Sequence, residues 1–459
     1  MPQDIVQQDR ATRRREQRRV ARPAAPIELR QYTPLVNEMP GIVADGSNPP
    51  AIPKIDPPKR GRKPRPVAQA ADSIVGEIYV PLLKEHLARL RAASNHPNRT
   101  LHWDTVLVSL LMGFFNTADN SLRMLEDLSC CEESQPMTGG RIPRCTMSDA
   151  MASMNPTLLL PIVQMLIKRV PGLKHVDSDL AALLKSIVAA DGSIFTLPAD
   201  VLWGIALTRS NGKVGRQLRL DLQLDVLQFT PVGLGIDGAE QGNEAAAFGK
   251  QLLPGVIYLC DRNFVNYDFL HKVLIVGSDF VVRLKSSTGF FVTEERELTE
   301  EDRKAGVIYD RIGHLSDSFG DNTRIFREVG VIDPRTRKTV RLLTTLLDVA
   351  ARIIGKLYRH RWVVELFFKW LKCVAKLRHL VSHSKNGITI QFYVAVIIVL
   401  LTHLRTGHKP GVYEFNCLSW VADGKMSVET MHEVLARRQH ERDLNNARLA
   451  RKQAAEKQA

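Results

Sequence analysis

Two short apolar segments that each end in an aspartate most constrain what this chain can fold into. One run, within KSIVAAD, is apolar up to Asp191, and a second, within GVIYLCD, is apolar up to Asp261. Short continuous apolar runs predict strands buried within a sheet. Segments with helical spacing lie between and after them, so the pattern predicts an α/β domain. An acid at the end of each strand would be held rigidly.

Neighbouring patterns extend the predicted sheet. Residues 216–237 alternate apolar and polar side chains and predict two strands, DFVVRLK (279–285) predicts another, and 323–348 predicts a hairpin that turns at DPRTRK. We therefore expect an α/β domain over 180–405 with a β-rich insertion at about 286–348. Helices are expected near 242–251, 264–276 and 349–380.

Residues 1–70 differ in composition from the rest of the chain. They hold 12 of the 24 prolines, and 14 Lys/Arg against 7 Asp/Glu, so their net charge of +7 is half of the total of +14. Such a segment buries too little apolar surface to order itself, and we predict a disordered basic arm. The excess of positive charge over the whole chain favours a polyanionic partner, most simply nucleic acid.

Two cationic patches lie in this arm. RRREQRR (13–19) is a plain basic run, and KRGRKPRP (59–66) resembles an AT-hook, a motif that lies along an A·T-rich minor groove. Lys63 interrupts the core of that motif, and a basic linker that touches phosphates is the alternative interpretation. Under either interpretation, Arg60 and Arg62 are candidate DNA contacts.

The remaining segments are predicted to be helical. Residues 76–175 show three-four apolar spacing and predict a small all-helical domain, and 406–459 predict a C-terminal helical basic tail. The apolar run 388–404 contains Thr389, Gln391 and His403 and is short for a membrane span, so it predicts a buried core helix. The six cysteines form no CxxC pair, which favours reduced, mostly buried thiols in a cytoplasmic protein with no membrane partner.

The segment YRHRWVVELFFKWLK (358–372) combines a charged stripe with an otherwise apolar helix. Tyr358, Arg361, Glu365, Lys369 and Lys372 follow at steps of three, four, four and three residues, which places them on one face. Because the other positions are mostly apolar, we expect a buried helix whose stripe faces a ligand. The alternative is a solvated ion-pair face.

Three acids in this domain could share a metal site. Asp191 and Asp261 follow strands, Glu365 lies on the stripe, and carboxylates with phosphate oxygens are the ligands that Mg²⁺ prefers. Two ions would suit an in-line phosphoryl displacement, with Asp191 bridging them. Arg361, Lys369, Lys372 and Tyr358 would then contact DNA phosphates.

The pattern Y-x2-R-x3-E-x6-K with a lysine four residues after the glutamate resembles the YREKK signature of a large group of bacterial insertion-sequence transposases. ADGSIF around Asp191 and YLCDRNF around Asp261, with Arg262 following, resemble the first and second aspartate motifs of that group. The resemblance covers about 180–405. It implies a ribonuclease H-like core, a DDE triad of Asp191, Asp261 and Glu365, and Mg²⁺ or Mn²⁺.

The expected function is therefore a transposase that cuts double-stranded DNA at the ends of its element and joins them to target DNA. We expect a homodimer in the synaptic complex. Two alternatives stay open: a ribonuclease H-like nuclease without strand transfer, and a non-catalytic DNA-binding protein descended from a transposase.

Overall fold

The computed structural model of the chain describes most residues beyond the basic arm. The described residues are 33–34, 74–115, 121–171, 178–181, 183, 186–208, 214–237, 245, 248–249, 252–315, 324–374, 377, 380–422 and 424–458. The predicted arm, including Arg60 and Arg62, lies outside them except for Thr33 and Pro34. Those two residues pair with Leu234 and Gly233 at the edge of the sheet, a contact that the composition of the arm did not predict.

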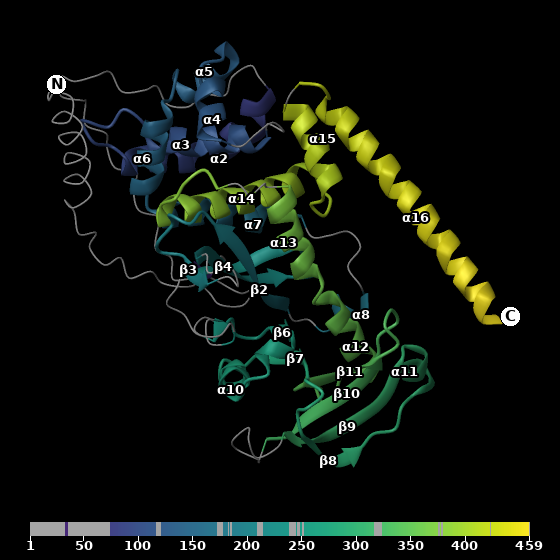
Figure 1. The fold of residues 1–459 in the computed structure, drawn as a ribbon. Coiled ribbons are helices and arrows are strands. Elements are labelled where there is room, and N and C mark those ends of the chain that lie inside the picture. Colours follow the sequence, from purple (N-terminus) through teal and green to yellow (C-terminus); the bar gives the residue numbers. More distant parts are fainter. Residues whose placement is uncertain are drawn as a thin grey trace, which may run out of the picture. The chain divides into compact units, whose positions relative to one another are not determined.

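The strands join into one large sheet (Figure 1). Their bounds are β1 Thr33–Pro34, β2 Ile187–Leu197, β3 Ile205–Thr208, β4 Val214–Asp225, β5 Thr230–Asp237, β6 Ile257–Cys260, β7 Asp279–Arg283, β8 Phe290–Glu295, β9 Val307–Leu315, β10 Phe326–Ile332 and β11 Thr339–Thr344. The order is β1-β5-β4-β2-β6-β7-β11-β10-β9-β8, and β3 pairs with β4.

The centre of the sheet has mixed strand directions. β5, β4 and β2 are antiparallel neighbours, while β2, β6 and β7 run parallel to one another. Their side chains alternate between two hydrophobic cores: Ala189, Leu259 and Val281 face one, and Val188, Tyr258 and Phe280 face the other. The predicted α/β class is confirmed.

The β-rich insertion continues the same sheet. β11 pairs with β7 from Leu342 opposite Arg283, and β10, β9 and β8 follow as antiparallel neighbours. The predicted hairpin is present, since β10 and β11 flank the turn between Ile332 and Thr339. The insertion therefore lies directly beside the strand that follows β6.

Helices precede and follow the sheet. Their bounds are α2 Ile74–Ala93, α3 Trp103–Phe115, α4 Leu122–Leu128, α5 Gln135–Thr138, α6 Arg144–Ser153, α7 Leu160–Arg169, α8 Ser178–Ala181, α10 Tyr267–Ile275, α11 Glu300–Lys304, α12 Ala351–His360, α13 Val363–Cys373, α14 Lys385–Thr406, α15 Val412–Ala422 and α16 Val428–Gln458, with short 3₁₀ turns at Glu132–Ser134 (η1), Pro156–Leu159 (η2) and Arg262–Phe264 (η3).

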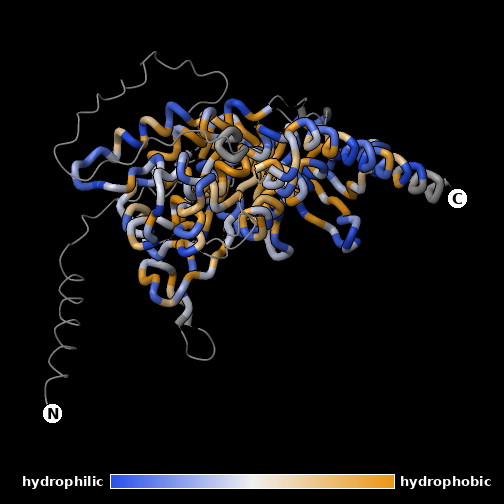
Figure 2. The backbone as a smooth tube through the Cα atoms, turned by 90° about the horizontal axis from the view of Figure 1, so that it is seen from above, coloured by the Kyte–Doolittle hydropathy of each residue, from blue (hydrophilic) through white to orange (hydrophobic). Residues whose placement is uncertain are grey.

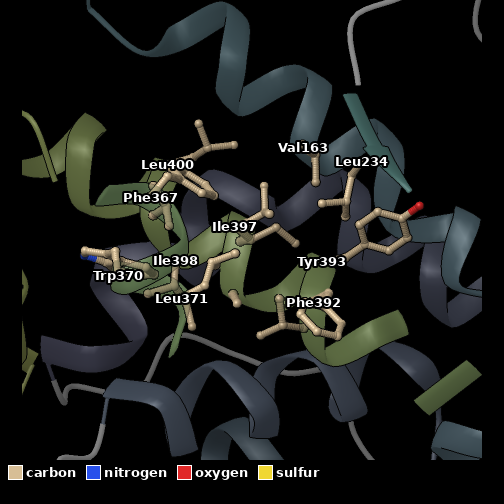
Figure 3. Packing of buried hydrophobic residues seen from close by; sticks show 14 of the residues in the cluster. Val163, Leu234, Phe367, Trp370, Leu371, Phe392, Tyr393, Ile397, Ile398 and Leu400 are labelled. Atoms are coloured by element: carbon tan, nitrogen blue, oxygen red, sulfur yellow. The ribbon is translucent and has the colours of Figure 1, made fainter. Parts of the chain in front are cut away.

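The N-terminal helices share a core with the rest of the chain. α3, α6 and α7 pack on α14, and Val163 of α7 lies in one cluster with Ile397 of α14 and Leu371 of α13 (Figure 3). The tube in Figure 2 shows hydrophobic residues gathered in this central region and mostly hydrophilic ones along α16. The described residues between 76 and 171 are thus mostly helical, and their core is continuous with that of the sheet.

α14 is the one described helix that is long and apolar enough to cross a membrane by length and composition. In the structure, 89% of its apolar window is buried inside the protein, which is typical of a core helix. The expectation of mostly buried thiols is wrong, because Cys130, Cys131, Cys145 and Cys373 are exposed and only Cys260 and Cys417 are buried.

Candidate active site

The register of the parallel strands places two of the predicted acids side by side. Ala189 of β2 pairs with Leu259 of β6. Asp191 and Asp261 each follow two residues later, so they lie at the same position along the two parallel chain segments. Because side chains alternate along a strand, both acids lie on the same side as Ala189 and Leu259, which face the core formed with α12, α13 and α14. Asp261 sits just past the end of β6, where its carboxylate accepts the backbone N–H of Asn263 at 2.7 Å.

Asp191 does not end its strand, contrary to the sequence prediction. β2 continues to Leu197 because its antiparallel pairing with β4 extends from Val188 to Leu197, whereas its described pairing with β6 ends at Ala189. Asp191 is therefore anchored on one side by β4 and lies beyond the ladder on the other. This leaves the carboxylate rigid and open toward the helices.

The predicted single helix over 358–372 is in fact two helices. α12 ends at His360 and α13 begins at Val363, so Arg361 and Trp362 form the junction. The prediction that the helix is buried outside its charged stripe is wrong at two positions, because Trp362 and Leu366 are 53% and 42% exposed.

Arg361 connects two of the three acids. Its Nη2 lies 2.5 Å from Glu365 Oε1, and its Nη1 lies 3.5 Å from Asp191 Oδ2. The guanidinium side chain is largely buried, with 13% exposed. The acid of β2 and the acid of α13 thus meet at one cation.

The environment disfavours charge on Asp191. Burial raises the pKa of this carboxyl to about 6; Arg361 opposes the shift, while the nearby charges of Glu365 and Asp261 add to it. Glu365 Oε2 is buried and has no hydrogen-bond partner. One guanidinium therefore leaves negative charge at this site incompletely compensated.

An open cavity of about 300 Å³ lies against these acids. It is lined by Asp191, Gly192, Ser193, Glu365, Phe368, Lys369, Lys372 and Cys373. Lys369 is exposed. Lys372 Nζ donates to Ser193 Oγ at 2.6 Å and lies 4.8 Å from the centre of the Phe195 ring, so both lysines of the stripe reach the cavity.

Two of the other predicted DNA contacts, Tyr358 and Arg262, lie near the acids. Burial raises the pKa of Tyr358, which Arg361 and Arg283 oppose and Asp261 reinforces, so this phenol lies among those charges. Arg361 also lies 6.0 Å from the Tyr358 ring centre. Arg262 is exposed in η3, immediately after Asp261.

Sequence reasoning missed Ser193 and Arg283. Ser193 faces the cavity because it is two residues beyond Asp191 on β2, and this period-two spacing could have identified it. Arg283 ends β7 at the level of Asp261, since Leu259 pairs with Val281. Arg283 could have been identified from the sequence, because it is an arginine at the end of a third predicted strand.

The acids fit a divalent cation in part. Within the described residues, no group of three or more His, Cys, Asp or Glu side chains is arranged to hold a metal ion. Asp191 nevertheless has a desolvated carboxyl, Glu365 has an unpartnered buried oxygen, and both residues line one cavity. This pair has the hard oxygen donors that Mg²⁺ or Mn²⁺ takes.

Fold and site together define an α/β protein with one acid on β2, a second directly after the neighbouring parallel strand β6, a third on α13 and cations around them. The sequence model of the transposase DDE domain family matches residues 183–401, so this segment of the chain is similar to that family. The resemblance to bacterial insertion-sequence DDE transposases is confirmed.

Three curated relatives agree with this assignment. The chain is 25% identical to "Putative transposase y4zB" of Sinorhizobium fredii over 45% of its own length and 58% of that protein. It is 39% identical to "Putative transposase for insertion sequence element IS4SA" of Synechocystis over 48% and 60%. It is 24% identical to "Probable transposase for insertion sequence element IS5377" of Geobacillus stearothermophilus over 45% of each chain. The matches span about half the length of these relatives.

Proposed function

We propose that this protein is a DDE transposase that cleaves DNA at the ends of its own element and joins the freed ends to target DNA. The observation that carries the proposal is the meeting of Asp191 and Glu365 at Arg361, beside a cavity that also exposes Lys369. Acids that bind metal and cations that bind phosphate are both needed to hold a phosphodiester for displacement.

The strand arrangement supports a ribonuclease H-like core. Three antiparallel strands, β5, β4 and β2, continue into β6 and β7, which run parallel to β2. In such a core the catalytic acids lie on β2 and directly after β6. The insertion of β8–β11 then precedes the helix that carries Glu365.

Asp191, Asp261 and Glu365 would hold Mg²⁺ or Mn²⁺, as two ions. Such ions supply Lewis-acid stabilisation of a phosphate and a deprotonated water at neutral pH. Arg361, Tyr358 and Arg262 bind and orient the phosphates on either side of the scissile bond, while Lys369 and Lys372 hold the strand in the cavity.

Two successive displacements account for the reaction. Water attacks the phosphorus at the element end, which releases a 3′-hydroxyl. That hydroxyl then attacks a phosphate of the target, so one P–O bond forms as another breaks. The partners are double-stranded DNA and a second copy of the chain in a synaptic complex, and the reaction takes place in the cytoplasm.

Replacing Glu365 by glutamine tests the catalytic assignment. The amide keeps the size of the side chain but removes charge, so cleavage with Mg²⁺ should fall by roughly 100-fold or more, while end binding persists or tightens. The matched control is Glu433→Gln on α16, which changes an exposed glutamate far along the chain.

Incubation with labelled element ends and target DNA separates the alternatives. Joined products support the proposal, cleaved but unjoined ends indicate a nuclease, and bound, uncut DNA indicates a non-catalytic binder. Normal cleavage by Glu365→Gln would show that Glu365 belongs to a structural ion pair.

A further inference from the structure

A second cavity lies among the N-terminal helices, outside the candidate active site. It has a volume of about 280 Å³ and lies between the loop that joins α2 to α3 and one face of α6. Its walls are mostly polar and consist of His96, Asn98, Arg99, Thr100, Leu101, Thr146, Asp149, Ala150 and Ser153. The active-site cavity has a different set of lining residues. We refer to the second cavity as the α2–α6 pocket.

The face of α6 that borders the pocket is polar, although the helix is anchored in the core. Thr146, Asp149 and Ser153 follow at steps of three and four residues, which places them on one face. Met147 and Met151 of the same helix are buried. The helix is therefore fixed by its apolar side, while its polar face forms a wall of the pocket.

Arg99 is a cation that the protein leaves without an acid. Its guanidinium lies over the Trp103 ring, 4.9 Å from the ring centre. Its Nη1 is buried and has no hydrogen-bond partner among the described residues, and the same holds for Nε1 of Trp103. Buried donors are normally paired with an acceptor. This arginine is therefore suited to an acceptor that the described part of the chain does not supply.

The groups around Arg99 include further hydrogen-bond donors. The backbone N–H of Asn98 donates to Nδ1 of His96 at 3.3 Å, so Nε2 carries the proton of the neutral imidazole and is a donor. The hydroxyls of Thr100 and Thr146 also line the pocket. A guanidinium with neighbouring imidazole and hydroxyl donors is an arrangement that binds phosphate oxygens.

Asp149 opposes an anion in this pocket. Its side chain is exposed on the pocket wall, and no ion pair joins it to Arg99 in the described structure. A carboxylate at this position repels negative charge and lowers the affinity for it. Neutralising Asp149 should therefore strengthen the binding of an anion.

We propose that the α2–α6 pocket binds a phosphate group, with Arg99 as its main ligand and His96 and Thr146 as further donors. The group is either a backbone phosphate of a DNA duplex or a free phosphate, because both present the same oxygens. The site goes beyond the proposed function, since it requires neither the three acids nor their metal ions.

Phosphate binding is measured with the full-length protein in EDTA. Inorganic phosphate is titrated calorimetrically at constant ionic strength. Arg99→Gln removes the charge and the forked donors, so it should weaken binding at least about tenfold. Asp149→Asn should strengthen binding about threefold, because a negative charge leaves the pocket wall.

Arg123→Gln is the matched control, because Arg123 is an exposed arginine on α4 that does not line the pocket. It should leave the phosphate affinity unchanged. Thermal unfolding of each variant checks that the fold is intact, and Asp149→Asn keeps the test valid if Arg99→Gln unfolds.

A duplex that lacks element ends distinguishes the two sources of phosphate. If the pocket holds a DNA backbone, Arg99→Gln should weaken duplex binding and lower its salt slope by about one. Unchanged duplex binding together with loss of inorganic phosphate binding identifies a free phosphate as the ligand.

Phosphate binding that survives Arg99→Gln but is lost in Lys369→Ala would overturn the proposal, because it would place the anion in the active-site cavity. So would the absence of any effect of a folded Arg99→Gln on either probe. Because both measurements are made without metal or cleavage, the result for Glu365→Gln tests the proposed function separately.

Discussion

At the scale of single residues, Arg361 determines the electrostatics of the site. It contacts Glu365 and Asp191 from the junction of two helices, so it partly neutralises both carboxylates, including that of Asp191, whose charge burial disfavours. Removing it would leave both acids without their shared cation. The acids in turn hold the guanidinium beside the cavity, where a phosphate would compete with them for it.

Because the pKa of Asp191 is raised, replacing this aspartate by a neutral side chain is predicted to stabilise the fold by an amount that depends on pH. The folded protein holds this proton up to a pKa of about 6, against an ordinary value of 3.8. The carboxyl therefore stabilises the fold fully below its ordinary pKa, and this contribution is lost as pH rises through about 6. Without metal, Asp191→Asn should raise the free energy of unfolding by about 1–3 kcal/mol at neutral pH.

Urea denaturation in EDTA at neutral and at acidic pH measures this effect. The gain should shrink toward zero in acid, where Asp191 itself is protonated. Asp348→Asn, a change at an exposed aspartate, should give no comparable gain at either pH. A loss of stability at neutral pH would show that the Arg361 contact outweighs the cost of burial.

At the scale of elements, the insertion holds α12 in place. Arg327 of β10 is buried, pairs with Asp310 of β9 at 2.7 Å and donates to the carbonyls of Leu346, Leu347 and Val349, just before α12. α12 also packs closely on β10, since a Cβ on Gly355 would lie 3.2 Å from Val331. The insertion thus fixes the helix that carries Tyr358 and leads to Arg361.

Arg327→Leu is therefore predicted to destabilise the protein strongly. It leaves Asp310 buried and unpaired and removes three bonds to the loop before α12, so the free energy of unfolding should fall by about 3–5 kcal/mol. Chemical denaturation measures the loss, with Arg335→Leu in the exposed β10–β11 turn as the control. Replacing Asp310 by leucine in addition should recover part of the loss, because no unpaired charge remains.

The elements that could be predicted from sequence are those with a strong local pattern. The strands around Val188, Leu222, Tyr258 and Val281 and the hairpin of β10 and β11 carry an apolar run or alternation that their burial requires. The triad residues and the stripe bases were predicted from their positions on such elements and from the family resemblance.

Features set by tertiary contacts could not be predicted. The charged stripe has continuous helical spacing across Arg361, so nothing local indicates the break between α12 and α13. β2 extends past Asp191 because of its pairing with β4, which lies about thirty residues further along the chain. Exposure of Trp362 and Leu366 likewise depends on which neighbours pack on α13, a property that helical periodicity does not contain.

At the scale of the whole molecule, a continuous core joins the N-terminal helices to the sheet. α14 is at its centre and contacts α3, α6, α7 and α15. Because these contacts cross the predicted domain boundary near residue 176, the helices and the sheet are expected to unfold as one cooperative unit. Residues 1–31 lie outside the described residues and carry their own share of positive charge.

That charge predicts the effect of removing the segment. Residues 1–31 hold 8 Lys/Arg and 4 Asp/Glu, a net charge of +4, while the described core begins its contacts at Thr33. Deleting them should leave thermal unfolding unchanged but weaken DNA binding and make its salt dependence shallower by up to about three to four units of slope. Replacing the five arginines of RRREQRR by glutamine should reproduce most of this effect at full length. If the deletion lowers the melting temperature instead, or if the glutamine variant binds DNA with an unchanged salt slope, the segment supports the fold and does not contact phosphates.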